Sequence, residues 1–186
     1  LTANFGELRT HHWHMGLDIR TQTRENLPVY AAAGGYIASI GVRPLSFGRF
    51  IIINHPNGLS TLYAHLNDFA PELETYVTNQ QYQQESWAIE LKFSSHQFPV
   101  SKGTFIGYSG NTGGSAGPHL HFEIMDTKTE RRLNPLLFGF PLEDKVPPVI
   151  KGIALYDRGR SINRQSPRAL PIKKIITGYT LANSDT

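Results

Sequence analysis

The chain has 186 residues, of which 39% are hydrophobic and 18% charged, proportions that are typical of a globular protein and unlike those of a disordered one. It has no cysteine, which excludes disulfides and thiolate metal sites, so any metal must be bound through nitrogen and oxygen. The net charge of +3 mildly favours an anionic partner such as a cell-wall polymer, but no dense run of Lys and Arg supports nucleic acid. No apolar run approaches the ~20 residues of a membrane-spanning helix.

Short β-strands are predicted in the first part of the chain. Residues 27–41, LPVYAAAGGYIASIG, predict two strands around Gly34 and Gly35. Residues 47–66 predict a hairpin, because two β-rich runs flank the segment NHPNG, which has the Pro, Asn and Gly that a tight turn requires. This hairpin places His65 near the end of a strand.

Residues 71–92 break the pattern and predict a helix. A proline that suits the first helical position is followed by a run rich in Glu and Gln. We therefore expect a helical insertion over about 71–100. An apolar set that includes Tyr76, Trp87 and Ile89 is expected to pack it onto the β core.

Residues 119–125, HLHFEIM, return to β character and alternate regularly. His119, His121 and Glu123 fall on one face of the predicted strand, and apolar side chains fall on the other. Glu123 is expected at the surface, with a role beside a metal ligand as the alternative. Two histidines thus share one face of a strand.

A Pro-rich stretch after residue 134 predicts a domain edge. We expect a mainly β domain over 1–143, with a compact antiparallel sheet or barrel-sandwich core and the helical insertion. Residues 144–186 are expected to form a short β-type C-terminal extension, interpreted as the start of a truncated β-sandwich.

The segment RTHHWHMGLDIR, residues 9–20, holds three of the eight histidines of the chain. His14 and Asp18 stand four residues apart with a glycine between them, so both side chains can reach one point. His121 would complete a set of two histidines and one carboxylate, the three-ligand arrangement of a catalytic zinc with an open position. His11 and His12 lack this spacing and are interpreted as rim residues.

The sequence resembles the lysostaphin-like, LytM-type zinc metallopeptidases that cut bacterial peptidoglycan. The resemblance covers roughly residues 4–140 and rests on four motifs in the order of that family: NFGELR, HMGLDI, LYAHL and GYSGNTGGSAGPHLHFEI. The histidines and the aspartate of these motifs are all present.

The resemblance implies that His14, Asp18 and His121 bind Zn²⁺. It implies that His65 and His119 are catalytic histidines that do not bind the metal. It also implies a groove over the metal, peptidoglycan as the substrate, and export to the periplasm or cell envelope. The insertion is expected to wall the groove and so to govern substrate size.

Two other functions are compatible with parts of the pattern. The first is a non-catalytic member of the same fold that binds cell wall or regulates another hydrolase, although such a protein normally has a broken metal set. The second is a β-barrel module that binds carbohydrate or a carrier, in which the histidines are incidental. The two metal motifs argue against such a module, and a measurement of zinc content would decide.

Overall fold

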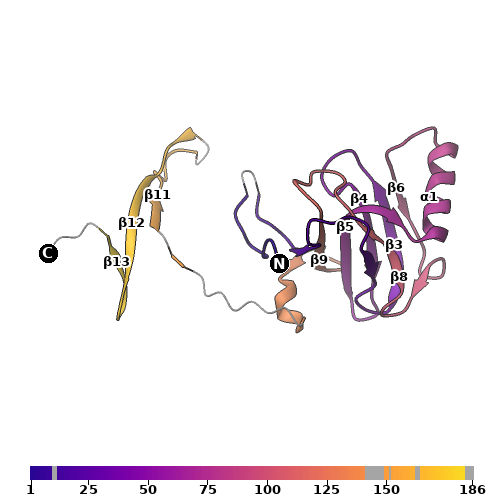
Figure 1. The fold of residues 1–186 in the computed structure, drawn as a ribbon, viewed down its shortest axis with the longest axis horizontal. Helices are drawn as coiled ribbons and strands as arrows, with labels where there is room; N and C mark the ends of the chain where they lie inside the picture. Colours follow the sequence, from indigo (N-terminus) through magenta and orange to yellow (C-terminus); the bar gives the residue numbers. More distant parts are fainter. Residues whose placement is uncertain (10–11, 141–148, 151, 162–163, 183–186) are drawn as a thin grey trace. The chain divides into compact units, whose positions relative to one another are not determined.

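The computed structural model describes residues 1–186 except 10–11, 141–148, 151, 162–163 and 183–186 (Figure 1). The chain forms two compact units, Leu1–Leu142 and Glu143–Thr186. Among the described residues, no helix is long and apolar enough to cross a membrane.

The first unit is built on one antiparallel sheet, whose main path runs β1-β9-β5-β4-β3-β6 (Figure 1). Further pairs join β10 to β9, β7 to β3, and β8 to both β2 and β5. This architecture confirms the predicted mainly β, antiparallel fold with one helix. The elements are β1 (Leu17–Arg20), β2 (Pro28–Tyr30), β3 (Gly35–Val42), β4 (Arg49–Asn54), β5 (Leu59–Phe69), α1 (Pro71–Gln83), β6 (Ile89–Lys92), β7 (Pro99–Val100), β8 (Phe105–Ser109), β9 (His119–Asp126), β10 (Arg132–Leu133) and the 3₁₀-helix η1 (Pro135–Phe138).

The central hairpin of β4 and β5 is as predicted. Its last pair joins Asn54 to Ser60. The turn closes through Gly58, whose φ of +80° suits a residue without Cβ, and Asn57 Oδ1 accepts a hydrogen bond from the amide of Leu59. The hairpin contributes fully buried isoleucines to the core. The two strands predicted within 27–41 are also confirmed, as β2 and β3.

The insertion differs from its prediction. Helix α1 ends at Gln83, and residues 89–92 form β6, which pairs with the edge of β3. The alternating burial of these four residues explains the difference, because period-two burial suits a strand against a sheet edge. Tyr76 packs against the core and Ile89 is 6% exposed, as expected, but Trp87 is 60% exposed and its predicted packing is wrong.

The second unit holds a three-stranded antiparallel meander of β11 (Gly152–Leu155), β12 (Arg168–Ile175) and β13 (Gly178–Leu181). These three strands agree with the expected β-type extension. The division into domains over 1–143 and 144–186, and the start of a β-sandwich, stay predictions.

Candidate metal centre

Two neighbouring strands bring the three predicted ligands together. Asp18 in β1 and His121 in β9 are direct partners in the antiparallel ladder. His14 lies just before β1, and Gly16 lets this segment pass close to β9. A Cβ at position 16 would lie 2.4 Å from the carbonyl oxygen of Phe122, so only glycine fits here. The glycine within the His-Asp spacing therefore has a packing role.

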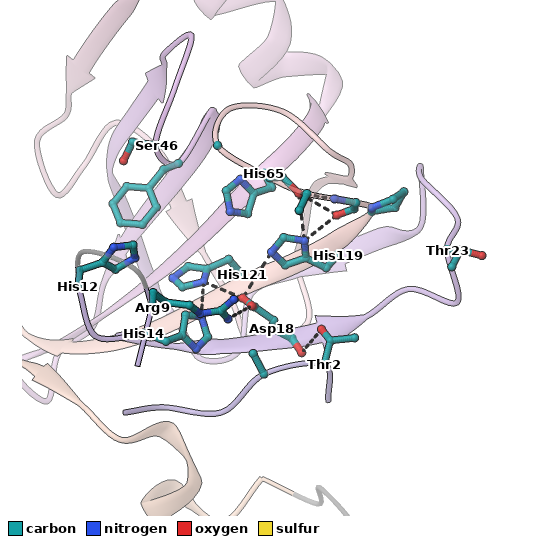
Figure 2. A pocket seen from close by; sticks show the side chains of 17 residues that line it. Thr2, Arg9, His12, His14, Asp18, Thr23, Ser46, His65, His119 and His121 are labelled. Carbon is teal, nitrogen blue, oxygen red and sulfur yellow. Dashed lines mark hydrogen bonds and ion pairs between the residues drawn. The ribbon is translucent and has the colours of Figure 1, made fainter. Parts of the chain in front are cut away.

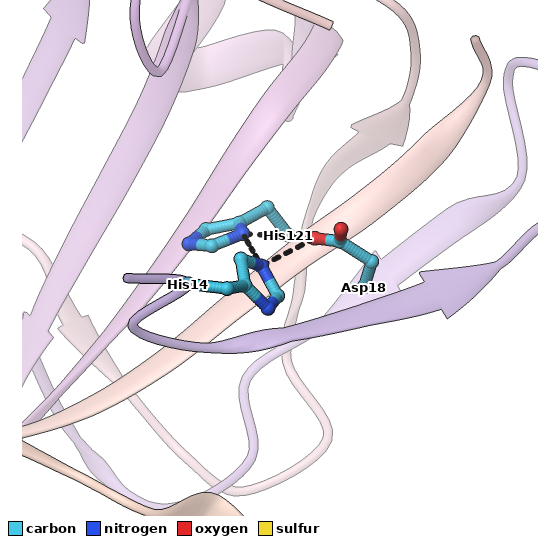
Figure 3. A group of neighbouring side chains, drawn as sticks. All are labelled: His14, Asp18 and His121. Atoms are coloured by element: carbon cyan, nitrogen blue, oxygen red, sulfur yellow. Dashed lines mark hydrogen bonds and ion pairs between the residues drawn. The ribbon is translucent and has the colours of Figure 1, made fainter. Parts of the chain in front are cut away.

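The three ligand atoms converge at one point (Figure 3). Oδ1 of Asp18 lies 3.0 Å from Nε2 of His14 and 2.9 Å from Nδ1 of His121. The two ring nitrogens are 3.1 Å apart, and all three residues are buried. Ligands about 2.0–2.1 Å from a tetrahedral zinc lie roughly 3.4 Å from one another. The triangle is therefore close to the size that such an ion requires.

Outer hydrogen bonds fix which nitrogen of each ring carries the proton. Nδ1 of His14 donates to the backbone oxygen of Asn4 at 2.8 Å, and Nε2 of His121 donates to Oε1 of Glu123 at 2.9 Å. A carbonyl or carboxylate oxygen accepts only, so each neutral ring keeps its proton on the outer nitrogen. The inner nitrogens and Oδ1 of Asp18 then bring three lone pairs together. Such a donor set fits a divalent metal ion.

The electrostatics of the site also favour a cation. Burial opposes the ionisation of Asp18, but the hydrogen bonds that the protonated rings of His119, His121 and His14 donate to it outweigh burial and hold the pKa of Asp18 well below its ordinary value. Burial by itself would lower the pKa of His121, yet hydrogen bonds to Asp18 and Glu123 raise it to about 8. The first shift keeps Asp18 an anionic carboxylate, and the second arises because this carboxylate and Glu123 favour positive charge beside them.

His65 and His119 lie beside the triangle, with ring centroids 4.7 Å apart (Figure 2). Nδ1 of His65 donates to the backbone oxygen of Thr112, and Nδ1 of His119 donates to that of Gly117, each at 2.8 Å. These bonds leave Nε2 of each ring for the groove, and Nε2 of His119 is 3.4 Å from Oδ1 of Asp18. In the described part of the chain, the group of side chains that could hold one ion consists of His14, Asp18 and His121. Neither His65 nor His119 belongs to this group.

The two rings have opposite electrostatic surroundings. Burial lowers the pKa of His65 to about 4, and the charges of His119 and His121 act in the same direction. The hydrogen bond with Asp18 raises the pKa of His119, although burial opposes it. Adjacent histidines with different pKa values suit different roles in proton transfer.

His65 sits at an irregular point of β5. Its φ is +60°, in the left-handed region that residues other than glycine seldom adopt. The pairing of β5 with β4 changes register across this point, between Tyr63 and Leu66, and its pairing with β8 changes register just beyond, between Leu66 and Asp68. The strand also continues four residues past His65 to Phe69, further than predicted. Strained backbone of this kind is characteristic of functional sites.

Glu123 was expected at the surface, and this expectation is wrong. The residue is 2% exposed. Its Oε1 accepts from His121, while its Oε2 accepts from Nε of Arg132 at 3.1 Å. The signal that pointed to this role was its position on the same strand face as the two histidines.

Arg9 is a residue that the sequence did not single out. Its guanidinium donates to Oδ2 of Asp18 at 3.0 Å, so the aspartate presents only Oδ1 to the triangle. His12 lines the groove, in keeping with a rim position, whereas His11 lies outside the described residues. The ring of His55, which follows β4, hydrogen-bonds to the backbone oxygen of Gly34 and the hydroxyl of Thr61 and is not part of this site.

Two hollows border the triangle of His14, Asp18 and His121. The first hollow has a volume of about 670 Å³ and contains all five predicted site residues (Figure 2). The second hollow has a volume of about 720 Å³ and includes His14 and His121. No residue of the insertion, 71–100, lines either hollow in the described structure. The expectation that the insertion walls the groove is therefore wrong.

Comparison with known proteins places the chain in a family. Residues 12–84 and 87–135 match Peptidase family M23. The chain is 34% identical over 113 residues to the DD-carboxypeptidase/endopeptidase Mpg of Neisseria meningitidis, which is 61% of this chain and 20% of Mpg. It is 28% identical over 153 residues to the peptidoglycan DD-endopeptidase ShyA of Vibrio cholerae, which is 79% of this chain and 29% of ShyA.

A solved zinc-containing peptidase from Vibrio cholerae has a similar structure, with a TM-score of 0.52 and 25% identity over 72% of this chain and 34% of that protein. The chain spans about a fifth of the length of Mpg. The family match covers most of the first unit and includes all five predicted site residues. The resemblance seen in the sequence is confirmed, and the chain belongs to Peptidase family M23.

Proposed function

We propose that this chain is a zinc-dependent endopeptidase that hydrolyses peptide bonds in the stem peptides or cross-bridges of bacterial peptidoglycan. The observation that carries the proposal is the meeting of three lone pairs, from His14, Asp18 and His121, at one buried point in a groove. Membership of a peptidase family supports it, as does a relative named as a peptidoglycan endopeptidase. Such an activity implies a location in the periplasm or cell envelope.

A bound Zn²⁺ would supply Lewis acidity, which lowers the pKa of water and polarises a peptide carbonyl. His14, Asp18 and His121 would hold it. Asp18 contributes one oxygen, because Arg9 binds the other. The carboxylate of Glu123 accepts the hydrogen bond from Nε2 of His121 and so makes Nδ1 of that ring a stronger ligand for the metal.

His65 and His119 would transfer protons. Backbone oxygens hold the Nδ1 proton of each ring, so Nε2 is the nitrogen through which each ring would exchange a proton in the groove. A ring in this state can accept a proton from attacking water, and can then donate it to the oxyanion or to the leaving nitrogen. Because the two rings are adjacent, one can accept while the other donates.

Digestion of purified peptidoglycan tests the proposal. Wild-type protein should release fragments whose masses show newly cleaved peptide bonds, and chelator should abolish release until zinc is restored. His119→Ala serves as the matched control, since it should keep the metal and lose the activity. A folded, zinc-loaded wild type that binds peptidoglycan but cleaves no bond would establish the non-catalytic alternative.

A further inference from the structure

The two hollows adjoin each other at His14 and His121, and the second hollow is called the second arm of the site. They share a common wall, which is formed by His12, His14, Ser46, Phe47 and His121. Two of these shared residues are proposed metal ligands. A bound peptide with its cleaved bond at the metal would therefore extend into both hollows.

The charges in the two hollows differ. In the first hollow the guanidinium of Arg9 is paired with Asp18. In the second hollow Arg132 is paired with the buried carboxylate of Glu123. Arg131 lines the second hollow as well, is exposed, and has no ion pair among the interactions of the described residues. One guanidinium is thus left for a ligand in the second arm.

The rest of the second hollow offers apolar contacts beside this charge. Trp13 is 54% exposed and Met15 is also exposed, and both line the hollow. Trp13 is held by a backbone bridge to Leu8. An exposed indole and an unpaired guanidinium in one hollow match a ligand that has a carboxylate on an aliphatic segment, since arginine can bind a carboxylate through two parallel hydrogen bonds.

We infer that the second hollow is a substrate subsite for a free carboxylate, which Arg131 binds while Trp13 and Met15 contact the aliphatic segment that carries it. This inference rests on the proposed peptidase function and names the part of the substrate that the second arm selects. It makes the free or amidated state of a stem-peptide carboxylate a determinant of cleavage.

The test compares two synthetic cross-linked stem-peptide dimers, one with its carboxylates free and one with them converted to carboxamides. Binding to zinc-loaded His119→Ala protein is measured by calorimetry, and cleavage by wild type is measured separately. We expect the carboxylate dimer to bind about tenfold or more tightly, the size of a hydrogen bond between charged groups. In the His119→Ala protein, a second substitution of Arg131→Gln should abolish the preference for the carboxylate dimer over the carboxamide dimer. Arg131→Lys in the same protein should keep part of this preference.

Lys128→Gln is the matched control, because it removes one positive charge from the same exposed turn between β9 and β10 at a residue that does not line the hollow. It should leave the preference intact. Equal binding of the two dimers, or an equal loss in both variants, would overturn the subsite. Absence of cleavage by wild type, with the binding preference intact, would count against the proposed function alone.

Discussion

The backbone oxygen of Thr112 accepts a hydrogen bond from Nδ1 of His65 at 2.8 Å, across 47 residues of sequence. The Thr112 hydroxyl meanwhile accepts from the amide of Arg49 at 3.0 Å and donates to the oxygen of Leu66 at 2.8 Å. One threonine thus ties the Gly-rich loop between β8 and β9, residues 110–118, to β4 and β5 and fixes the orientation of the His65 ring.

Removing the Thr112 hydroxyl should slow turnover without emptying the metal site. Thr112→Val keeps the shape of the side chain but loses both hydrogen bonds, so the loop and the carbonyl that orients His65 should shift. We expect kcat to fall by about 10- to 100-fold, as for a small misplacement of a catalytic group. Thr112→Ser, which retains the hydroxyl, should restore most of the rate.

Imidazole nitrogen NMR of the zinc-loaded variants checks the cause of this effect. Thr112→Val should change the tautomer signature of His65, and Thr112→Ser should not. A valine variant with wild-type kcat would show that the threonine is not needed to position the histidine.

Ligand and catalytic histidines should separate in metal analysis. His14→Ala and Asp18→Ala should lose zinc, because each removes one corner of the triangle. His65→Ala and His119→Ala should retain zinc while turnover falls by about 10²- to 10⁴-fold, the usual contribution of acid–base catalysis. Metal content after dialysis, measured by mass spectrometry, decides the assignment. Full zinc occupancy in Asp18→Ala would contradict it.

Glu123 should tune the affinity for the metal from behind His121. Glu123→Ala removes the acceptor that keeps the ring proton on the outer nitrogen, so zinc affinity should fall by about 10- to 100-fold. Glu123→Gln can still accept that hydrogen bond and should lose less. Competition with a chromogenic chelator measures both variants, and an unchanged affinity in Glu123→Ala would rule out the role.

The buried, neutral His65 should make stability depend on pH. Its pKa is about 4 in the folded protein and 6.5 ordinarily, so between these values the unfolded chain binds more protons than the folded one. The contribution of His65 to the free energy of unfolding is therefore complete above pH 6.5. It is lost progressively as pH falls from 6.5 through the folded pKa of about 4. Between these two pKa values, His65 lowers the free energy of unfolding by at most ~1.4 kcal/mol for each unit that the pH falls.

Urea unfolding in the presence of chelator, between pH 4.5 and 7.5, measures this dependence. His65→Gln should show a shallower fall in the free energy of unfolding below pH 6.5 than the wild type. His96→Gln, an exposed histidine of the insertion, is the control and should follow the wild-type slope. An identical slope in all three proteins would refute the prediction.

The sequence predicts what is local and leaves out what depends on distant partners. The β4–β5 hairpin follows from its own turn residues, and the alternation in β9 predicts that His119 and His121 share a face. The end of α1 was misplaced, because residues 89–92 become a strand only when the edge of β3 is available.

The same limit applies within the site. The motifs identified the triangle of His14, Asp18 and His121, since each motif is contiguous in sequence. The burial of Glu123 depends on Arg132 in β10, and the role of Arg9 depends on how its loop returns to Asp18. No spacing rule in one sequence encodes either contact.

The pairing of Asp18 with His121 joins the first strand of the sheet to its last long strand, across 103 residues. An ion held there would act as a cross-link that closes a loop of that length, and loop closure restricts the unfolded chain. The amides of β1 and the backbone around His14 should then exchange with deuterium more slowly when metal is bound. Metal loading would in this way lock the amino-terminal segment onto the sheet and shield it from proteases.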